Sequence, residues 1–354
     1  MEKNYNVIGL MSGTSLDGLD IAFIEFTNTE SKWFHEIKFA ETIKYNPKLE
    51  FSLRSAHNLN GFLLKKLDNE LGNFIGKCTK SFILKHNIKP EIVSSHGHTV
   101  FHDPSQSLTL QIGNGAAIAA MVELPVVCDF RSLDVAFKGQ GAPLVPIGDE
   151  ILFSQYSYCI NLGGFANISY NIDESRIAYD ICPVNIVLNY YAERVQKKFD
   201  DNGNLARKGK INNSLLYELN NLSFYSKQFP KSLGREWVEN DFLPISDKFD
   251  ISVNDKLATI TEHIALQINN SLLNSSHSDI LVTGGGVYNT FLIERIKALT
   301  SKNIIIPDDN TINFKEALIF GFLGLLRFLN QINCLKSVTG ANKNNIGGAI
   351  YNGI

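Results

Sequence analysis

Near its start the chain carries Gly9-Leu10-Met11-Ser12-Gly13-Thr14-Ser15-Leu16-Asp17-Gly18-Leu19-Asp20, between two runs rich in Val, Ile and Phe at residues 6–10 and 21–26. Such runs favour strands, so the segment is predicted to be a β-hairpin with a polar tip. The glycines would let N–H groups of the tip face an anion, and Thr14 and Ser15 would add hydroxyl donors. Asp17 or Asp20 could hold Mg²⁺, directly or through water. The pattern predicts a phosphate-binding hairpin, and the alternative is an ordinary Gly/Asp turn.

The length and charge of the chain limit the kinds of protein that it can be. Its 354 residues exceed what one core usually fills, so two domains are expected, with a cleft between them as the place for a ligand. Hydrophobic content of 44% with 19% charged residues is typical of a globular protein. A net charge of −3 gives no electrostatic basis for binding nucleic acid. We therefore expect small-molecule partners and no nucleic acid.

The cysteines and the apolar runs predict a cytoplasmic protein. The five cysteines are far apart, contain no C-x-x-C pair and are odd in number, which is typical of reduced thiols. The first residues are polar and lack the apolar region of a signal peptide. The most apolar run, residues 318–329, is too short to cross a bilayer and contains Arg327, so no membrane association is expected.

Periodic apolar residues predict the main helices. The clearest stripe runs through residues 60–86, with Asn60 as a possible N-cap. Further helices are predicted at residues 116–121, 186–197, 256–273 and 317–330.

A short predicted strand at residues 92–95 runs into a polar turn with three histidines. His96, His98 and His102 suggest a metal site, but no fitting carboxylate or cysteine lies nearby in the sequence. We therefore favour hydrogen bonding of the His96-Gly97 turn to a polar ligand, and the alternative is a structural histidine.

A second predicted strand, at residues 125–127, is followed by Asp129 and Arg131. A carboxylate can bind sugar hydroxyls, and a guanidinium can bind a carboxylate or a ring substituent. The pair is therefore a candidate sugar-binding site, and a surface salt bridge is the alternative.

The opening pattern returns in the second half of the chain. Residues 139–146 are rich in Gly and Pro and are interpreted as the passage between domains. Residues 158–170 then form a strand, a turn with Gly163 and Gly164, and a second strand. This segment is a second candidate phosphate hairpin, one for each domain.

Two further strand ends carry candidate functional residues. The predicted strand at residues 177–179 ends at Asp180, where a catalytic carboxylate is commonly placed; the alternative is a helix N-cap. The strand at residues 279–282 runs into Thr283-Gly284-Gly285-Gly286, and three glycines there would allow a flat ligand and its phosphates to approach the backbone.

Taken together, these motifs resemble the anhydro-N-acetylmuramic acid kinase family of the actin, hexokinase and heat-shock-chaperone superfamily. The resemblance spans nearly the whole chain. It is carried by residues 11–20, Ser95-His96-Gly97-His98-Thr99, residues 109–113, Asp129-Phe130-Arg131, residues 141–146, Asn161-Leu162-Gly163-Gly164 and Thr283-Gly284-Gly285-Gly286. It implies an α/β fold, the two-lobed actin-like ATPase (ribonuclease-H-like) type with an inter-lobe cleft. Residues 1–130 and about 315–354 would form the first lobe, and residues 131–314 the second.

The resemblance also implies an activity and roles for the motifs. Members use ATP, with Mg²⁺, and water to open the 1,6-anhydro bridge of anhydro-N-acetylmuramic acid in cell-wall recycling, and a homodimer is implied. The phosphates would lie between residues 13–20 and 163–164, with Asp17 near the metal, and the adenosine over residues 283–286. The sugar would contact His96, Gly97, Asp129, Arg131 and Glu316, and Asp180 would be the general base.

One motif departs from the family pattern. Where the family typically has Asp-Thr-Gly-Pro-Gly-Asn, this chain has Asp180-Ile181-Cys182-Pro183-Val184-Asn185. The carboxylate is kept, but a backbone contact made by the family's glycines is put in question.

Two other functions fit parts of the sequence. One is a superfamily kinase in which Asp180 deprotonates an ordinary sugar hydroxyl. The other is an actin-like or chaperone-like ATP-binding protein that is not an enzyme, which would be expected to have a long partner-binding segment.

Overall fold

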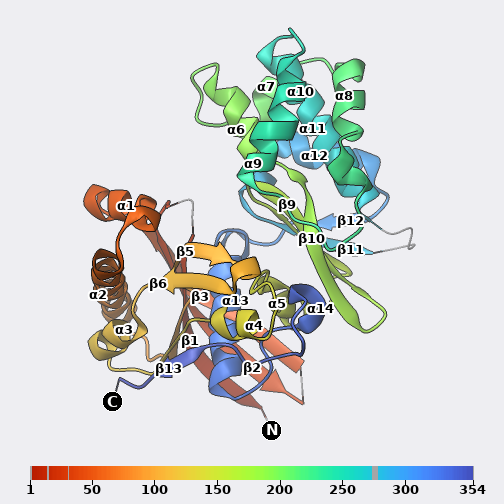
Figure 1. Cartoon of the computed structure of the whole chain (residues 1–354). Coiled ribbons are helices and arrows are strands. Elements are labelled where there is room, and N and C mark those ends of the chain that lie inside the picture. The colour runs from red at the N-terminus through yellow and green to blue at the C-terminus, as the bar shows by residue number, and fades with distance from the viewer. Residues whose placement is uncertain (1, 14–15, 31, 273–277, 354) are drawn as a thin grey trace. The chain divides into compact units, whose positions relative to one another are not determined.

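The chain divides into two compact units, each with its own β-sheet. The computed structural model describes residues 2–13, 16–30, 32–272 and 278–353 (Figure 1). Unit 1 comprises Met1–Phe153 and Phe314–Ile354, and unit 2 comprises Ser154–Asn313. The predicted α/β class is confirmed, because helices cover a mixed sheet in both units.

Unit 1 is built on a six-stranded mixed sheet in the order β13-β7-β4-β1-β2-β3. The opening hairpin and the strand after it form an antiparallel meander, and β4 and β7 then pair in parallel with β1 and with each other. The strands are β1 (Lys3–Ser12), β2 (Leu19–Thr29), β3 (Lys32–Ile43), β4 (Ile92–Ser95), β7 (Val126–Cys128) and β13 (Ala349–Tyr351). A small separate sheet pairs β5 (His98–Asp103) with β6 (Leu108–Ile112).

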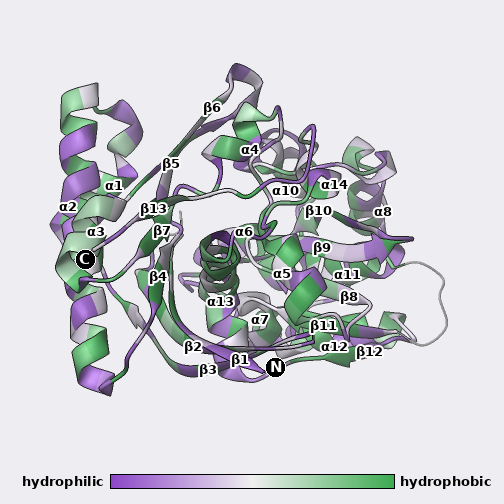
Figure 2. Ribbon diagram, turned by 90° about the horizontal axis from the view of Figure 1, so that it is seen from below, coloured by the Kyte–Doolittle hydropathy of each residue, from purple (hydrophilic) through white to green (hydrophobic). Residues whose placement is uncertain are grey.

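Helices cover both faces of this sheet. Figure 2 shows α2 (Gly61–His86) and α3 (Gly115–Val122) on one side of the strands and α13 (Asp309–Phe328) on the other. Alternate residues of β2 explain this, because Ile21 and Phe23 pack in the core with α2, whereas the Phe26 ring lies 5.3 Å from that of Phe322 in α13. The other helices of unit 1 are α1 (Pro47–Arg54), α4 (Ser132–Ala136), α5 (Val145–Leu152) and α14 (Lys336–Thr339).

Both of the longest predicted helices form. One begins at the predicted position, and the other begins earlier. The side chain of Asn60 accepts a hydrogen bond from the N–H of Leu63 at 3.0 Å, so the predicted cap of α2 is confirmed. In contrast, α13 begins at Asp309 and not at Ala317, because Asp308 accepts the N–H of Thr311 and so caps the helix earlier.

Unit 2 is built on a five-stranded sheet in the order β10-β9-β8-β11-β12. Its strands are β8 (Tyr158–Leu162), β9 (Phe165–Ile172), β10 (Ser175–Pro183), β11 (Asp279–Thr283) and β12 (Asn303–Ile305). Its helices are α6 (Asn185–Glu193), α7 (Asn204–Lys208), α8 (Asn213–Asn220), α9 (Arg235–Trp237), α10 (Leu243–Asp247), α11 (Val253–Asn270) and α12 (Thr290–Leu299). Their buried apolar residues form one continuous core with the sheet.

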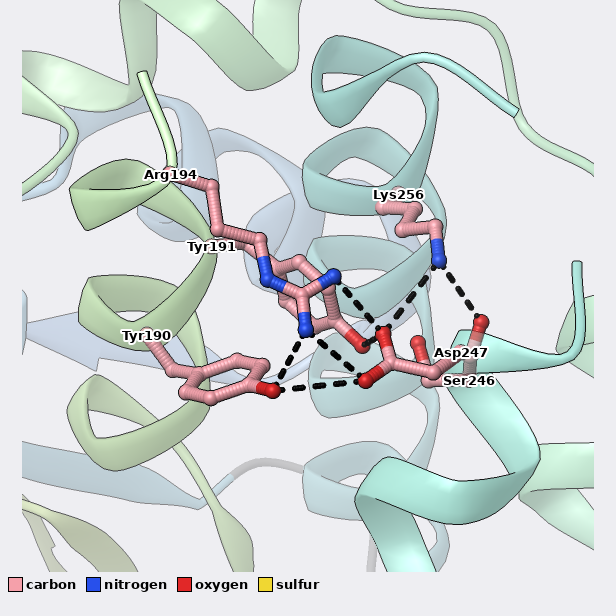
Figure 3. A network of polar contacts seen from close by, with 6 residues as sticks. All are labelled: Tyr190, Tyr191, Arg194, Ser246, Asp247 and Lys256. Atoms are coloured by element: carbon pink, nitrogen blue, oxygen red, sulfur yellow. Dashed lines mark hydrogen bonds and ion pairs between the residues drawn. The ribbon is translucent and has the colours of Figure 1, made fainter. Parts of the chain in front are cut away.

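A polar network fastens α6 to α10 and α11 (Figure 3). The carboxylate of Asp247 accepts hydrogen bonds from the hydroxyl of Tyr191 at 2.8 Å and from Arg194 at 2.8 and 3.0 Å. The ammonium group of Lys256 lies 3.4 Å from the same carboxylate and donates to the carbonyl of Ser246 at 2.9 Å. Because α6 follows the Asp180 motif directly, the network fixes the helix on which that motif ends.

The boundary between the units differs from the predicted one. Residues 131–153 lie in unit 1, so residues 139–146 are not the passage between units. The buried carboxylate of Asp134 explains this, because it accepts hydrogen bonds from the N–H of Gly141, from Thr339 and from Asn345 at 2.8–2.9 Å. These bonds tie the segment to the C-terminal part of unit 1.

The state of the cysteines agrees with the predicted reduced thiols. All five cysteines are free thiols, and Cys159, Cys182 and Cys334 are buried. In the part of the chain that the structure describes, no helix combines the length and hydropathy that a bilayer span requires.

Candidate active site

In unit 2 the second predicted phosphate hairpin lies at one end of the sheet. Strands β8 and β9 pair antiparallel up to Leu162 and Ala166, and the N–H of Gly163 donates to the carbonyl of Phe165 at 3.1 Å. A Cβ built on Gly164 would meet no atom within 4 Å, so the tip is open on that side. The hairpin therefore leaves room for a ligand at its glycines.

The glycine turn after β11 lies beside this hairpin. Thr283 pairs with Asn161 of β8, and the following Gly284 has a φ of +84°, which favours glycine. A Cβ on Gly284 would approach the Oδ1 atom of Asn161 to 2.6 Å, and one on Gly286 would approach the Cβ of Leu162 to 2.7 Å. A Cβ on Gly285 would meet nothing within 4 Å. Two of the glycines thus allow close packing on β8, and Gly285 faces open space.

Asp180 lies on β10, which borders the same hairpin through β9. It pairs with Asn167, and the register then shifts so that Cys182 pairs with Ala166. Its carboxylate accepts the N–H of Leu233 at 2.8 Å. Burial raises the pKa of Asp180 above its ordinary value, and the hydrogen bond from Leu233 opposes that rise. A carboxylate with a raised pKa is a stronger base than an exposed one.

The residues at which the Asp180 motif differs from the family pattern are part of the core. Ile181, Cys182 and Val184 are 2%, 0% and 0% exposed. The N–H of Val184 donates to the carbonyl of Gly164 at 2.8 Å, and the N–H of Asn185 donates to that of Gly163 at 3.2 Å. The N–H groups of Val184 and Asn185 therefore bond to the hairpin and are not free for a ligand.

The helix-cap alternative for Asp180 is wrong. Helix α6 begins at Asn185, its N-cap residue is Val184, and no side chain caps it. The carboxylate of Asp180 is instead bonded to a segment 53 residues later in the chain.

In unit 1 the first hairpin forms as predicted on both flanks of its tip. Ser12 pairs with Leu19, while Thr14 and Ser15 lie outside the described residues. Leu16 and Leu19 are 7% and 0% exposed, so their side chains belong to the core and only their backbone could contact a phosphate. Gly13 and Gly18 lie at the tip between Ser12 and Leu19, and the N–H of Leu16 donates to the carbonyl of Gly13 at 3.3 Å.

Two carboxylates of this hairpin, Asp17 and Asp20, interact through their charges. Burial raises the pKa of Asp20, a hydrogen bond from Thr42 at 2.5 Å opposes the rise, and the charge of Asp17 adds to it. Carboxylate oxygens are the type of ligand that Mg²⁺ prefers, and it commonly uses one or two protein carboxylates beside substrate phosphates. Among the residues that the structure describes, no group of three or more His, Cys, Asp or Glu side chains could hold a metal ion.

The turn after β4 brings His96 to Arg131. The N–H of His96 donates to the carbonyl of Leu10 at 3.0 Å, which places the turn beside the end of β1. The Nε2 atom of His96 lies 3.2 Å from Nε and 2.9 Å from Nη2 of Arg131. Since a guanidinium can only donate, Nε2 accepts and the ring proton is on Nδ1, which donates to the carbonyl of Gly97 at 2.9 Å. Burial lowers the pKa of His96 to about 3, with the charge of Arg131 adding to the effect.

His96 therefore supports Arg131, and its ring nitrogens are already bonded. Arg131 also donates from Nη1 to the carbonyl of Gly141 at 2.7 Å. Of the five N–H donors of a guanidinium, these contacts use three, so one donor remains on each terminal nitrogen in the described structure. Donors on the two terminal nitrogens of a guanidinium can bind a carboxylate.

The other two predicted sugar contacts, Asp129 and Glu316, have different surroundings from those of Arg131. Asp129 is exposed and accepts the hydroxyl of Ser132 at 2.5 Å, at the start of α4. Glu316 is accessible to solvent on α13, yet surrounding protein raises the pKa of its carboxyl, and the charge of Asp20 adds to the rise. The charges of Arg131 and Lys315 act in the opposite direction, so Glu316, Asp20 and Arg131 lie in one electrostatic neighbourhood.

Two contributors to these sites had no signal in the sequence analysis. The segment 231–233 bonds to Asp180 through its main chain. Such bonds do not depend on the residue type, so the sequence does not indicate them. Asp134, which fixes Gly141 beneath Arg131, is a single acidic residue whose partners Thr339 and Asn345 lie more than 200 positions away.

Comparison with known proteins identifies the family. The family model for anhydro-N-acetylmuramic acid kinase matches residues 5–353. The chain is 34% identical to the anhydro-N-acetylmuramic acid kinase of Pasteurella multocida (strain Pm70), covering 99% of this chain and 97% of that one. It is 31% identical to the enzyme of the same name from Microcystis aeruginosa (strain NIES-843 / IAM M-2473), covering 98% and 99%.

Among solved structures, matches include a ROK family glucokinase from Streptomyces griseus in complex with glucose and AMPPNP. That match has 12% identity and a TM-score of 0.41, and it covers 90% of this chain and 99% of that one. A dehydratase component from Acidaminococcus fermentans matches with 11% identity, a TM-score of 0.44, and coverage of 90% and 97%. On the match to the family model and to full-length relatives, the chain belongs to the anhydro-N-acetylmuramic acid kinase family.

Proposed function

We propose that this protein uses ATP and water to convert 1,6-anhydro-N-acetylmuramic acid into N-acetylmuramic acid 6-phosphate and ADP, in peptidoglycan recycling. The family supports this reaction. The observation that carries it is the position of Asp180, a carboxylate with a raised pKa on the strand next to the open Gly163-Gly164 hairpin. A base beside a phosphate-binding turn is the combination that the reaction needs.

The substrate dictates what the base must do. The anhydro sugar has no free hydroxyl at carbon 6, so phosphorylation there requires the bridge to break. We propose that Asp180 takes a proton from a water whose oxygen bonds to carbon 1, opposite the bridge oxygen. The bond between carbon 1 and the bridge oxygen then breaks, oxygen 6 takes the γ-phosphoryl group, and ADP leaves. Carbon 1 inverts and keeps the new hydroxyl, and Asp180 later returns its proton to solvent.

For the nucleotide we propose three contacts. Phosphates bind the Gly163-Gly164 hairpin and the hairpin of residues 13–20, and the adenosine lies over residues 283–286, where Gly285 has open space beside it. Asp17 would hold Mg²⁺, with Asp20 near it, and the ion would supply positive charge to the triphosphate.

For the sugar we propose that Arg131 binds the lactyl carboxylate, which distinguishes muramic acid from glucosamine. Its two remaining donors support this, because a bidentate contact supplies both charge and orientation. The His96-Gly97 turn, Asp129 and Glu316 are proposed as further sugar contacts; for His96 the contact would come from its backbone.

Phosphorus NMR of the products tests the reaction. Purified protein is incubated with ATP and Mg²⁺, together with anhydro-N-acetylmuramic acid or with free N-acetylmuramic acid, in ¹⁸O-labelled water. We expect a sugar 6-phosphate from the anhydro sugar alone, with the label at carbon 1 and none in the phosphate. Phosphorylation of the free sugar at a similar rate, or label in the phosphate, would overturn the proposal.

Of two remaining expectations, the dimer rests on the resemblance and the location on the composition. A homodimer and a cytoplasmic location stay predictions, and light scattering at several protein concentrations tests the first.

A further inference from the structure

Among the described residues, the carboxylate of Asp180 is bonded through one of its two oxygens. Its Oδ2 atom accepts the main-chain N–H of Leu233 at 2.8 Å. Within the described residues, its Oδ1 atom accepts no hydrogen bond from the protein. Asp180 is also only partly buried, so this oxygen is the one that a water could reach.

The segment that carries Leu233 is fastened to β10 at several points. The N–H of Asp180 donates to the carbonyl of Lys231 at 3.1 Å, so residues 231 and 233 bond to Asp180 from both its backbone and its side chain. The ring of Phe229 stacks on that of Tyr179, with centroids 5.8 Å apart and an angle of 11°. These contacts flank the bond between Leu233 and Asp180 on the N-terminal side.

The side chain of Lys231 contacts two aromatic rings and so strengthens this attachment. Its ammonium group lies 4.7 Å from the ring centre of Phe224 and 5.7 Å from that of Tyr179. Burial raises the pKa of Asp180, and the hydrogen bond from the main-chain N–H of Leu233 lowers it. The segment therefore acts on Asp180 through its main chain.

We propose that the Leu233 N–H is a positioning group for the catalytic base. It fixes Oδ2 so that Oδ1 faces the water, and it offsets part of the rise in the pKa of Asp180 that burial causes, which favours the ionised form of the base. This inference rests on the proposed function, because it presumes that Asp180 is the base. A segment that only stabilised the fold would not change the ionisation of that carboxyl.

An amide-to-ester substitution at position 233 tests the proposal directly. Incorporating the α-hydroxy acid analogue of leucine removes the N–H and keeps the side chain. Leu233→Ala is the matched control, because it removes the side chain and keeps the N–H. Two quantities are measured for each protein, the pH dependence of kcat/KM with ATP and the anhydro sugar, and the pKa of Asp180 from ¹³C-aspartate NMR, with Asp180→Asn identifying its resonance.

In the ester protein we expect the pKa of Asp180 and the acidic limb of the pH profile to move up together by about one pH unit. We expect neither to move in Leu233→Ala. An unchanged pKa of Asp180 in the folded ester protein would overturn the positioning role. A shifted pKa with an unchanged kcat/KM profile, in a protein whose Asp180→Asn variant keeps its turnover, would instead overturn the assignment of Asp180 as base and with it the proposed function.

Discussion

The Nε2 atom of His96 accepts hydrogen bonds from two nitrogens of Arg131, 3.2 Å from Nε and 2.9 Å from Nη2. This contact fixes both the tautomer of the histidine and the direction of the guanidinium. His96 therefore orients Arg131. The contact affects both the stability of the protein and the binding of the sugar by Arg131.

The first prediction concerns the stability of the protein against pH. The pKa of His96 is lowered from 6.5 to about 3, so the unfolded chain takes up a proton at higher pH than the folded one. The stability contributed by the neutral ring is therefore present above pH 6.5 and lost as the pH falls toward 3. His96→Gln should make the free energy of unfolding less dependent on pH across this window, as measured by guanidinium denaturation. His263→Gln should act similarly, because burial lowers the pKa of His263 to about 3. An equally steep dependence in His96→Gln would contradict the assignment.

The second prediction concerns recognition of the lactyl group. Arg131→Lys replaces a planar fork by a single ammonium and loses the contacts to His96 and Gly141. We expect kcat/KM for the muramic substrate to fall about tenfold more than for an anhydro amino sugar without the lactyl group. Steady-state kinetics with both sugars measure the difference. Equal losses would mean that Arg131 does not bind that carboxylate.

The third prediction separates the glycines of the turn after β11. Gly285→Leu has open space for its side chain, so the protein should fold normally while its affinity for ATP falls about tenfold or more. Its affinity for the sugar should be unchanged in calorimetry. Gly284→Ala is the contrasting variant and should lower thermal stability, because its φ is +84° and its Cβ would meet Asn161. Equal loss of ATP and sugar binding in folded Gly285→Leu would argue against a nucleotide site at this turn.

The fourth prediction concerns the network in Figure 3. Burial alone would raise the pKa of Asp247, but hydrogen bonds from Arg194 and Tyr191 and the nearby cations lower it. Its contribution to stability is therefore present at neutral pH and is lost as the pH falls through the lowered pKa. Asp247→Asn should reduce the free energy of unfolding at pH 7 by about 1–3 kcal/mol, with less effect at pH 3.

Glu239→Gln is the control for that experiment. Its partner Arg235 is 80% exposed in its side chain, so the loss of this ion pair should change stability by less than about 0.5 kcal/mol. If Asp247→Asn were as mild as Glu239→Gln, the network would not stabilise α6.

Local patterns in the sequence predicted the secondary-structure elements. The unit boundary and the burial of the Asp180 motif were not predicted, because they depend on contacts between distant residues. The cap at Asn60 and both glycine hairpins follow from residue types within a few positions of one another. The membership of residues 131–153 in unit 1 depends on Asp134 and partners near residue 340, which no local pattern reports. The buried state of Ile181 and Val184 was equally hidden, because it depends on how β10 packs in unit 2.

In the candidate site, too, residues marked by local sequence patterns were predicted, whereas contacts between distant segments were not. Asp180, Gly163 and Gly285 were found because their types stand out at strand ends, and the structure brings them to one end of the unit 2 sheet. The ring of His96 was expected to meet a ligand, whereas its hydrogen bonds are directed to Arg131 and Gly97. The bond from Leu233 to Asp180 is made by backbone, so a sequence cannot show it.

The most direct test of the account is the rate of turnover of Asp180→Asn with saturating ATP and anhydro-N-acetylmuramic acid. The amide keeps the shape of the side chain and its hydrogen bond to the N–H of Leu233, but it cannot accept a proton from water. The account predicts that both substrates still bind while kcat falls by at least about a hundredfold. A variant that binds both substrates and turns over at a near-normal rate would contradict the claim that Asp180 activates the water that opens the bridge.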